Sequence, residues 1–218
     1  MQDQAAYKVS DPFTTKNIVA GGTYTTRKVV IAAGALLAGA VLGAILAASA
    51  ATATAGTPVS GSGGTVGNGT VSAVTTDDGA PAGVWMLTCT ATGATGKFTV
   101  KRPDGTLDGI LTIGTPYNGG INLTVSDGAN DWLVGDIIPV TVEYDAAALE
   151  YVLSEADAAD GSQIPALVLA QDADASAGSV EAMTYETGQI VGSALTLGDG
   201  HTIDSIREGL RLKGILIH

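Results

Sequence analysis

The side chains that most often carry catalysis are few in this chain, and none of them is spaced as a known catalytic set. The two histidines, His201 and His218, are far apart, one in a glycine turn and one at the last position. No nucleophile-elbow motif is present. The glycine runs also lack the Gly-Lys-Ser/Thr ending of a phosphate-binding loop. The sequence therefore predicts that the protein is not an enzyme.

Metal chemistry has two possible sources in the sequence. The carboxylates of Asp157, Asp160, Asp172 and Asp174 could offer oxygen ligands to Ca²⁺. Their spacing matches no EF-hand loop, and acidic turns of this kind are more often simply solvated. Cys89 is the single cysteine, which excludes a cysteine-rich zinc site and an intrachain disulfide. We therefore expect no metal and no cofactor, and we expect Cys89 to be a small buried core residue.

The charge balance limits the partners that the protein can bind. A formal net charge of −12 repels nucleic acid and anionic lipid. The lysines and arginines lie in three places: the N-terminal region through Lys28, residues 97–102 and residues 207–213. Because no basic stripe is present, we expect no direct nucleic-acid partner. The absence of a disulfide framework fits assembly in a reducing cytoplasm.

A charge-free run from Val29 to Ala55 could form a membrane-spanning helix or a signal peptide. Its length and hydropathy are those of a membrane helix, and Arg27 and Lys28 stand before it. Gly39 and Gly43 have the GxxxG spacing of a helix-dimerisation face. The basic pair, the apolar run and the small residues at 48–50 also imitate a signal peptide. A membrane-anchored or secreted bacterial surface protein with a β-sandwich adhesion module is therefore the alternative reading.

Two features of the same region favour strands. The segment before the run is too long for a signal-peptide n-region and carries Asp3 and Asp11. Gly34, Gly39 and Gly43 recur at turn-like intervals, which weakens any helix. These two features leave the membrane alternative open. Together with the family resemblance described below, which implies a strand, a glycine turn and a second strand, they predict that residues 29–47 form two strands joined near residues 33–34, with no membrane partner.

The first 26 residues read as an extended N-terminal arm. They lack strand or helix periodicity and are broken by Pro12, Gly21 and Gly22. A disordered tail is one interpretation. The other is an arm that adds as a strand to the sheet edge of another protein, for which the segment Tyr7–Phe13 has enough alternating bulk. The candidate contact residues of the arm are apolar or aromatic: Tyr7, Val9, Pro12, Phe13, Ile18 and Val19.

The middle of the chain reads as a separate small β-domain. Residues 48–69 have the composition of a linker. Short strand-like runs then alternate with turn signals, a pattern typical of a sandwich or compact barrel. The expected strands are 70–75, 84–90, 97–101, 107–113, 121–125 and 136–144. Trp85, Phe98 and Trp132 are the expected core anchors of this domain, and a role of the two tryptophans as ligand platforms is the less common alternative.

The last part of the chain returns to mixed structure. Residues 146–154 predict a strand or the start of a short helix, and residues 164–171 and 180–185 predict strands. Residues 203–212 fit one short amphipathic helix with Thr202 as N-cap, followed by a strand at 215–217.

Several motifs in these flanking regions resemble tailed-bacteriophage head decoration proteins of the lambda type. Residues 29–43, VVIAAGALLAGAVLG, are similar to the opening strand, glycine turn and second strand of that family. Residues 160–170, DGSQIPALVLA, and the acidic loop at 172–178 are similar to a later strand and its loop. Residues 181–188, and the closing segment from 195 to 216, follow in the family's order. The resemblance covers roughly residues 27–46 and 148–218.

This resemblance implies a mainly β fold with a division into three parts. A small mixed β-core, or pseudo-barrel, with one short C-terminal helix would be formed by residues 27–58 and 145–218. The arm at 1–26 would precede it, and residues 59–144 would be an inserted antiparallel β-sandwich-like domain. The implied function is structural: a capsid decoration, or cement, protein that binds the outer surface of the expanded head as a homotrimer. Its partner would be the major capsid protein, and its location the virion.

Overall fold

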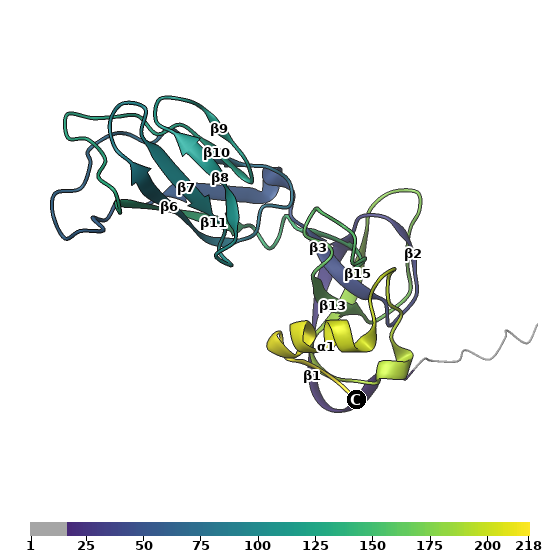
Figure 1. Cartoon of the computed structure of the whole chain (residues 1–218). Coiled ribbons are helices and arrows are strands. Elements are labelled where there is room, and N and C mark those ends of the chain that lie inside the picture. Colours follow the sequence, from purple (N-terminus) through teal and green to yellow (C-terminus); the bar gives the residue numbers. More distant parts are fainter. Residues whose placement is uncertain (1–16) are drawn as a thin grey trace, which may run out of the picture.

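The computed structural model describes residues 17–218, which form two β-structures, each with its own buried core (Figure 1). The first is a barrel, in which β1 pairs with both β12 and β15 and so closes a five-stranded ring. Its strands in ring order are β1 (Val19–Ile31), β12 (Glu150–Leu153), β3 (Val41–Ile45), β13 (Pro165–Leu169) and β15 (Val180–Ile190). The mainly β fold expected from the sequence is therefore confirmed.

Smaller elements complete the barrel. The strand β16 (Ile215–Ile217) adds in parallel to β15, and β2 (Gly34–Leu36) pairs with β14 (Ala173–Ala175) in a separate ribbon. Two short 3-10 turns lie at Ala48–Ala50 and Gly192–Ala194.

The helix α1 (Ile203–Leu212) has the predicted bounds and the predicted cap. The Thr202 side chain accepts a hydrogen bond from the backbone N–H of Ser205, and the Ser205 hydroxyl accepts one from the N–H of Thr202. Ile206 and Leu210 are buried against the barrel, because positions four apart fall on one face of a helix.

The second structure is a sandwich of two antiparallel sheets. The larger sheet has the order β4 (Ala51–Ala55), β11 (Ile137–Tyr144), β6 (Gly83–Ala91), β7 (Lys97–Lys101) and β8 (Leu107–Thr112). The smaller sheet has the order β5 (Thr75–Thr76), β10 (Ile121–Leu123) and β9 (Tyr117–Asn118).

Aromatic side chains fill the sandwich core. Trp85, Phe98 and Trp132 have no exposed surface, and the rings of Phe98 and Trp132 meet edge to face with centroids 5.6 Å apart. Cys89 is buried in the same core. Asp136 is also fully buried, and its carboxylate accepts hydrogen bonds from the backbone N–H groups of Gly67 and Leu133, so that it joins the two loops around Trp132.

The charge-free run is a set of strands, as predicted, but it contains three strand segments and not two. Residues 29–47 hold the end of β1, then β2, then β3. Gly34 and Gly39 both have positive φ, so the chain turns twice and pairs with β14 on the way. Among residues 17–218, no helix is long and apolar enough to cross a membrane.

Two element boundaries differ from the sequence expectation. The first barrel strand begins at Val19 and not at residue 27, since main-chain pairing with β15 holds residues 19–26 although most of their side chains are exposed. The sandwich begins at Ala51 and not at residue 59, because the Ala-Thr-Ala-Thr-Ala segment pairs with β11 from Ala51↔Tyr144 to Ala55↔Val140. Small residues give linker-like composition even where they form an edge strand.

We predict that Gly43→Ala destabilises the barrel. A Cβ at this position of β3 would overlap the backbone carbonyl of Ser162, which cannot move without displacing β13. Overpacking of this kind costs about 1–3 kcal/mol or more. The measurement is denaturant unfolding followed by two probes: far-UV circular dichroism, which includes α1, and tryptophan fluorescence, since both tryptophans lie in the sandwich.

The matched control is Gly209→Ala on α1, where an added Cβ meets open space. It should stabilise the helix by about 0.5–1 kcal/mol. Equal losses in both probes for Gly43→Ala would contradict a local effect on the barrel.

Candidate functional site

The N-terminal end of β1 is the first candidate binding surface, because the described residues begin beside it, at residue 17. Ile18 is 4% exposed and packs in a cluster with Ile190, Ile206 and Ile217, and Val19 packs against the same cluster. These two predicted contact residues are therefore part of the barrel core. The other four, Tyr7, Val9, Pro12 and Phe13, lie outside the described residues.

Beyond Val19, β1 offers a strand edge. It pairs with β15 along its length, whereas β12 meets only Val30 and Ile31 on the other side. Within residues 17–218, the opposite edge of β1 from residue 19 to 29 has no strand partner. A strand edge of this length presents N–H and C=O groups that a strand of another protein can pair with.

The side chains of this ribbon are partly aromatic and mostly self-paired. Tyr24 is 53% exposed, and its ring meets that of Tyr185 edge to face at a centroid distance of 5.4 Å. Arg27 Nε lies 3.2 Å from a carboxylate oxygen of Glu186, and its Nη2 donates to the Tyr151 hydroxyl. The surface is therefore suited to main-chain pairing and aromatic contact more than to charge recognition.

A serine–histidine contact is the nearest approach to a catalytic pair. Ser154 Oγ lies 3.1 Å from His201 Nε2. The Ser154 hydroxyl donates to the backbone carbonyl of Ser162, and its side chain has no exposed surface. A nucleophilic serine must give its proton to the histidine and must meet the substrate. Ser154 gives its proton to a carbonyl and is shielded from solvent, so it meets neither requirement in this structure. The contact with His201 connects the end of β12 to the turn before α1.

The acidic turns hold the backbone. Asp160 and Asp174 each accept hydrogen bonds from the serine two positions later, and Asp172 accepts one from the N–H of Ala38. Across the described part of the chain, no three potential metal-ligating side chains gather at one place. These carboxylates act as turn-forming groups.

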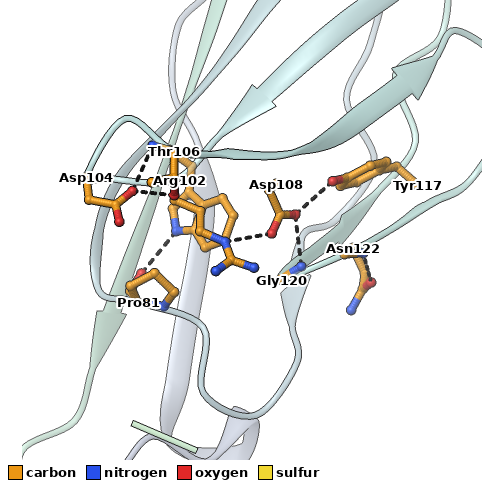
Figure 2. Close-up of polar contacts among 10 residues, drawn as sticks. Pro81, Arg102, Asp104, Thr106, Asp108, Tyr117, Gly120 and Asn122 are labelled. Atoms are coloured by element: carbon orange, nitrogen blue, oxygen red, sulfur yellow. Dashed lines mark hydrogen bonds and ion pairs between the residues drawn. The ribbon is translucent and has the colours of Figure 1, made fainter. Parts of the chain in front are cut away.

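A polar cluster around the buried Asp108 was not predicted from the sequence (Figure 2). It lies at the end of the sandwich nearest the barrel, because Arg102 lines one cleft together with the barrel residue Ile164. Asp108, with a side chain only 2% exposed, accepts hydrogen bonds from Arg102 Nε at 2.8 Å, the Tyr117 hydroxyl at 2.7 Å and the N–H of Gly120 at 3.0 Å. Burial, and then the hydrogen bond to Asp108, raises the pKa of Tyr117. The cluster links β8, β9 and the turn that leads to β10.

A cleft between the barrel and the sandwich is the second candidate surface. It has a volume of about 450 Å³. Arg102, at the edge of the polar cluster, is one of its lining residues, and Lys213 after α1 is another. Its wall on the barrel side is formed by Ala44, Leu46, Gly161, Gln163, Ile164 and Ala166.

Comparison with known proteins supports one family. Residues 124–211 match the family model of bacteriophage lambda head decoration protein D. The resemblance to head decoration proteins is thereby confirmed, and the match overlaps the residues that carry the resemblance at 148–211. A search of curated proteins finds no match.

One solved structure, a crystal structure of FlgL from Xanthomonas campestris, matches at 18% identity with a TM-score of 0.31. The match covers 48% of this chain and 31% of that chain, and a likeness of this level carries no argument.

We predict that the sandwich loses stability as the pH rises above about 10, the pKa of an unperturbed tyrosine. Because the folded-state pKa of Tyr117 is raised, its stabilising effect is present below the unfolded pKa and is lost as the pH rises toward the folded pKa. The loss from this one group is at most about 1.4 kcal/mol per pH unit. Tryptophan-fluorescence unfolding curves at several pH values measure it.

Tyr117→Phe is the control, because it cannot ionise. Its unfolding free energy should be lower near neutral pH, where the hydrogen bond to Asp108 is lost, but should fall less steeply above pH 10. An identical slope in both proteins would contradict the role given to Tyr117.

Proposed function

We propose that this protein is a capsid decoration, or cement, protein that binds the outer surface of an expanded phage head as a homotrimer and stabilises the head against internal DNA pressure. The observation that carries the proposal is the family match over residues 124–211. The closed barrel with an open β1 edge supports it, because such an edge leads directly into the N-terminal segment. The major capsid protein is the proposed partner.

The proposed mechanism is mechanical. A trimer presents three equal sets of contacts, so modest contacts combine through effective concentration into very slow release. An N-terminal arm that adds as a strand to a neighbouring subunit carries these contacts across a subunit boundary. The net charge of −12 suits a protein that lies outside the shell and makes no contact with packaged DNA.

The energy of the arm must come mainly from its side chains. Each main-chain hydrogen bond contributes about 0.5–1.5 kcal/mol net. Ordering the backbone costs about 1–2 kcal/mol per residue. The hydrogen bonds alone therefore do not offset the ordering cost, and burial of the large side chains must supply the difference. Tyr7 and Phe13 are the two largest side chains of residues 1–16.

We predict that Tyr7→Ser with Phe13→Ser weakens head binding nearly as much as deletion of residues 1–16. The deletion stops before Ile18, because that residue belongs to the barrel core. Co-sedimentation with expanded, DNA-free heads across a concentration series measures binding. The matched control is Gln2→Ser with Gln4→Ser, which should bind as the native chain does. Unchanged affinity in both the double variant and the deletion would mean that the arm takes no part in binding.

We also predict that the barrel binds heads without the sandwich. The backbone N–H of Asp145 donates to the carbonyl of Ala50 at 3.0 Å, so the two ends of the insertion meet. Residues 51–144 can therefore be replaced by a short Gly-Ser bridge. A cut at residues 70–143 would be less suitable, because it would leave β4 without β11.

The shortened chain should retain the circular dichroism of α1 and co-sediment with expanded heads. If it folds and no longer binds, the sandwich contributes to the capsid-binding surface. The assignment of head binding to the barrel alone is then wrong.

A further inference from the structure

The most exposed large apolar side chain among residues 17–218 lies at the end of α1. Leu212 is 78% exposed, and Leu216 on β16 is 42% exposed. Between α1 and β16 lies a groove of about 190 Å³, which is lined by Arg207, Arg211, Leu216, Ile217 and His218. We call Leu212, Leu216 and this groove the α1–β16 surface. Exposed apolar side chains beside a groove are typical of a surface that contacts another macromolecule.

This surface lies beside the start of the described chain. Arg207 Nη1 donates to the carbonyl of Ile217 at 2.7 Å, and Ile217 pairs with Ile190 of β15. The next residue, Val191, donates its N–H to the carbonyl of Ile18 at 2.8 Å. Ile18 and Ile217 also belong to one buried cluster. The α1–β16 surface and residue 17 therefore share one end of the barrel, and residues 1–16 directly precede that residue in the sequence.

The sandwich leaves the barrel at a different place. In Figure 1, α1 and the C-terminal end lie at the bottom of the barrel, whereas the sandwich projects from its upper side. The chain enters the sandwich after β3 and returns to the barrel at β12. A barrel that rests on a surface through α1 and β16 therefore leaves the sandwich free to project outward.

The length of chain before residue 17 selects the partner of this surface. The proposed function assigns Tyr7 and Phe13 to head binding. An extended chain spans at most about 3.3–3.6 Å per residue, so Phe13 reaches no farther than about 14 Å from residue 17. With Phe13 bound to the head, the shell must therefore lie within that distance of residue 17. A shell so close faces the end of the barrel that carries the α1–β16 surface.

The contact that this surface offers is mainly apolar. Arg211 Nη2 lies 2.8 Å from a carboxylate oxygen of Glu208, and Arg207 Nη1 is bound to the carbonyl of Ile217. Because these groups already have partners, burial of the two leucines supplies most of the attraction. The complementary surface is therefore an apolar patch of a protein shell.

We propose that the α1–β16 surface is the part of the barrel that docks on the head, with Leu212 and Leu216 packed against an apolar patch of the major capsid protein. The inference rests on the proposed decoration function and assigns to it a second contact, which the folded barrel makes beside the binding site of residues 1–16. The backbone of this surface is already fixed by the fold, so the contact carries no backbone ordering cost.

Serine replacement tests the contact. Leu212→Ser with Leu216→Ser should weaken co-sedimentation with expanded, DNA-free heads at least tenfold, because each trimer loses the apolar contact three times. Since Leu212 is mostly exposed, Leu212→Ser alone repeats the test without loss of folded structure, which circular dichroism checks. The matched control is Leu37→Ser with Leu107→Ser. These leucines are 63% and 59% exposed, lie after β2 and on β8, and should be replaceable without effect on binding.

A photo-cross-link identifies the partner directly. Leu212→Cys is labelled with a benzophenone maleimide, and heads decorated with the labelled chain are irradiated. The label should form an adduct with the major capsid protein, whereas the same label on Leu107→Cys should form none. The native Cys89 is not labelled in the folded chain, because it is buried.

The outcomes separate this inference from the proposed function. If the native chain and the leucine variants bind heads equally well, the contact is wrong and the decoration function stands. An adduct between two copies of this chain, or a change of oligomeric state in the leucine variants, would assign the surface to a contact between copies and overturn the proposal. An adduct with residues 1–16 of the same chain would also overturn it. A native chain that does not bind heads would remove the decoration function itself.

Discussion

The barrel depends on β1, which pairs with strands on both of its sides. It meets β12 in parallel at Val30 and Ile31 and β15 in antiparallel fashion over most of its length. Without it, the remaining four strands would form an open sheet with two exposed edges. A buried hydroxyl strengthens the seam, since Thr184 on β15 donates to the carbonyl of Arg27. The start of the described chain is thereby fixed against its C-terminal half.

The sandwich is attached to the barrel by more than its two chain connections. The N–H of Gly79 donates to the carbonyl of Leu46, and the N–H of Ala48 donates to the carboxylate of Asp78. On the barrel side, Leu46 is held in turn by its own N–H, which donates to the carbonyl of Asp160. Gly79 has positive φ, and a Cβ there would overlap the carbonyl of Ala159. These contacts form a third point of attachment beside the cleft. The walls of the cleft are therefore held at a set spacing.

Much of the fold could be predicted because its signals are local. The helix 203–212 follows from Thr202 and the spacing of Ile206 and Leu210, and most sandwich strands follow from alternation around Trp85 and Phe98. The starts of β1 and β4 could not be predicted in this way. Their side chains are small or mostly exposed, and main-chain pairing with distant strands determines them.

The polar cluster around Asp108 escaped prediction for a related reason. Its members come from β8, β9 and the segments next to them, and only the folded sandwich brings them together. A carboxylate in a strand with turn residues on either side looks like an ordinary surface group. The Ser154–His201 contact shows the opposite case, because the residue types suggest chemistry and the hydrogen-bond directions show a structural bond. The lining of the interdomain cleft depends on how two separate cores are joined, which no local pattern encodes.

The meeting of Ala50 and Asp145 also has a consequence for how the chain folds. The barrel must join β3 to β12, which flank the whole insertion. Closing a flexible loop costs about 0.6 kcal/mol more for each doubling of its length. A sandwich that has already folded brings its two ends together, and so shortens the effective loop by a factor of about ten, which is about three doublings and about 2 kcal/mol. Early folding of the sandwich would therefore lower the entropic barrier to barrel closure, even though the inserted residues add no strand to the barrel itself.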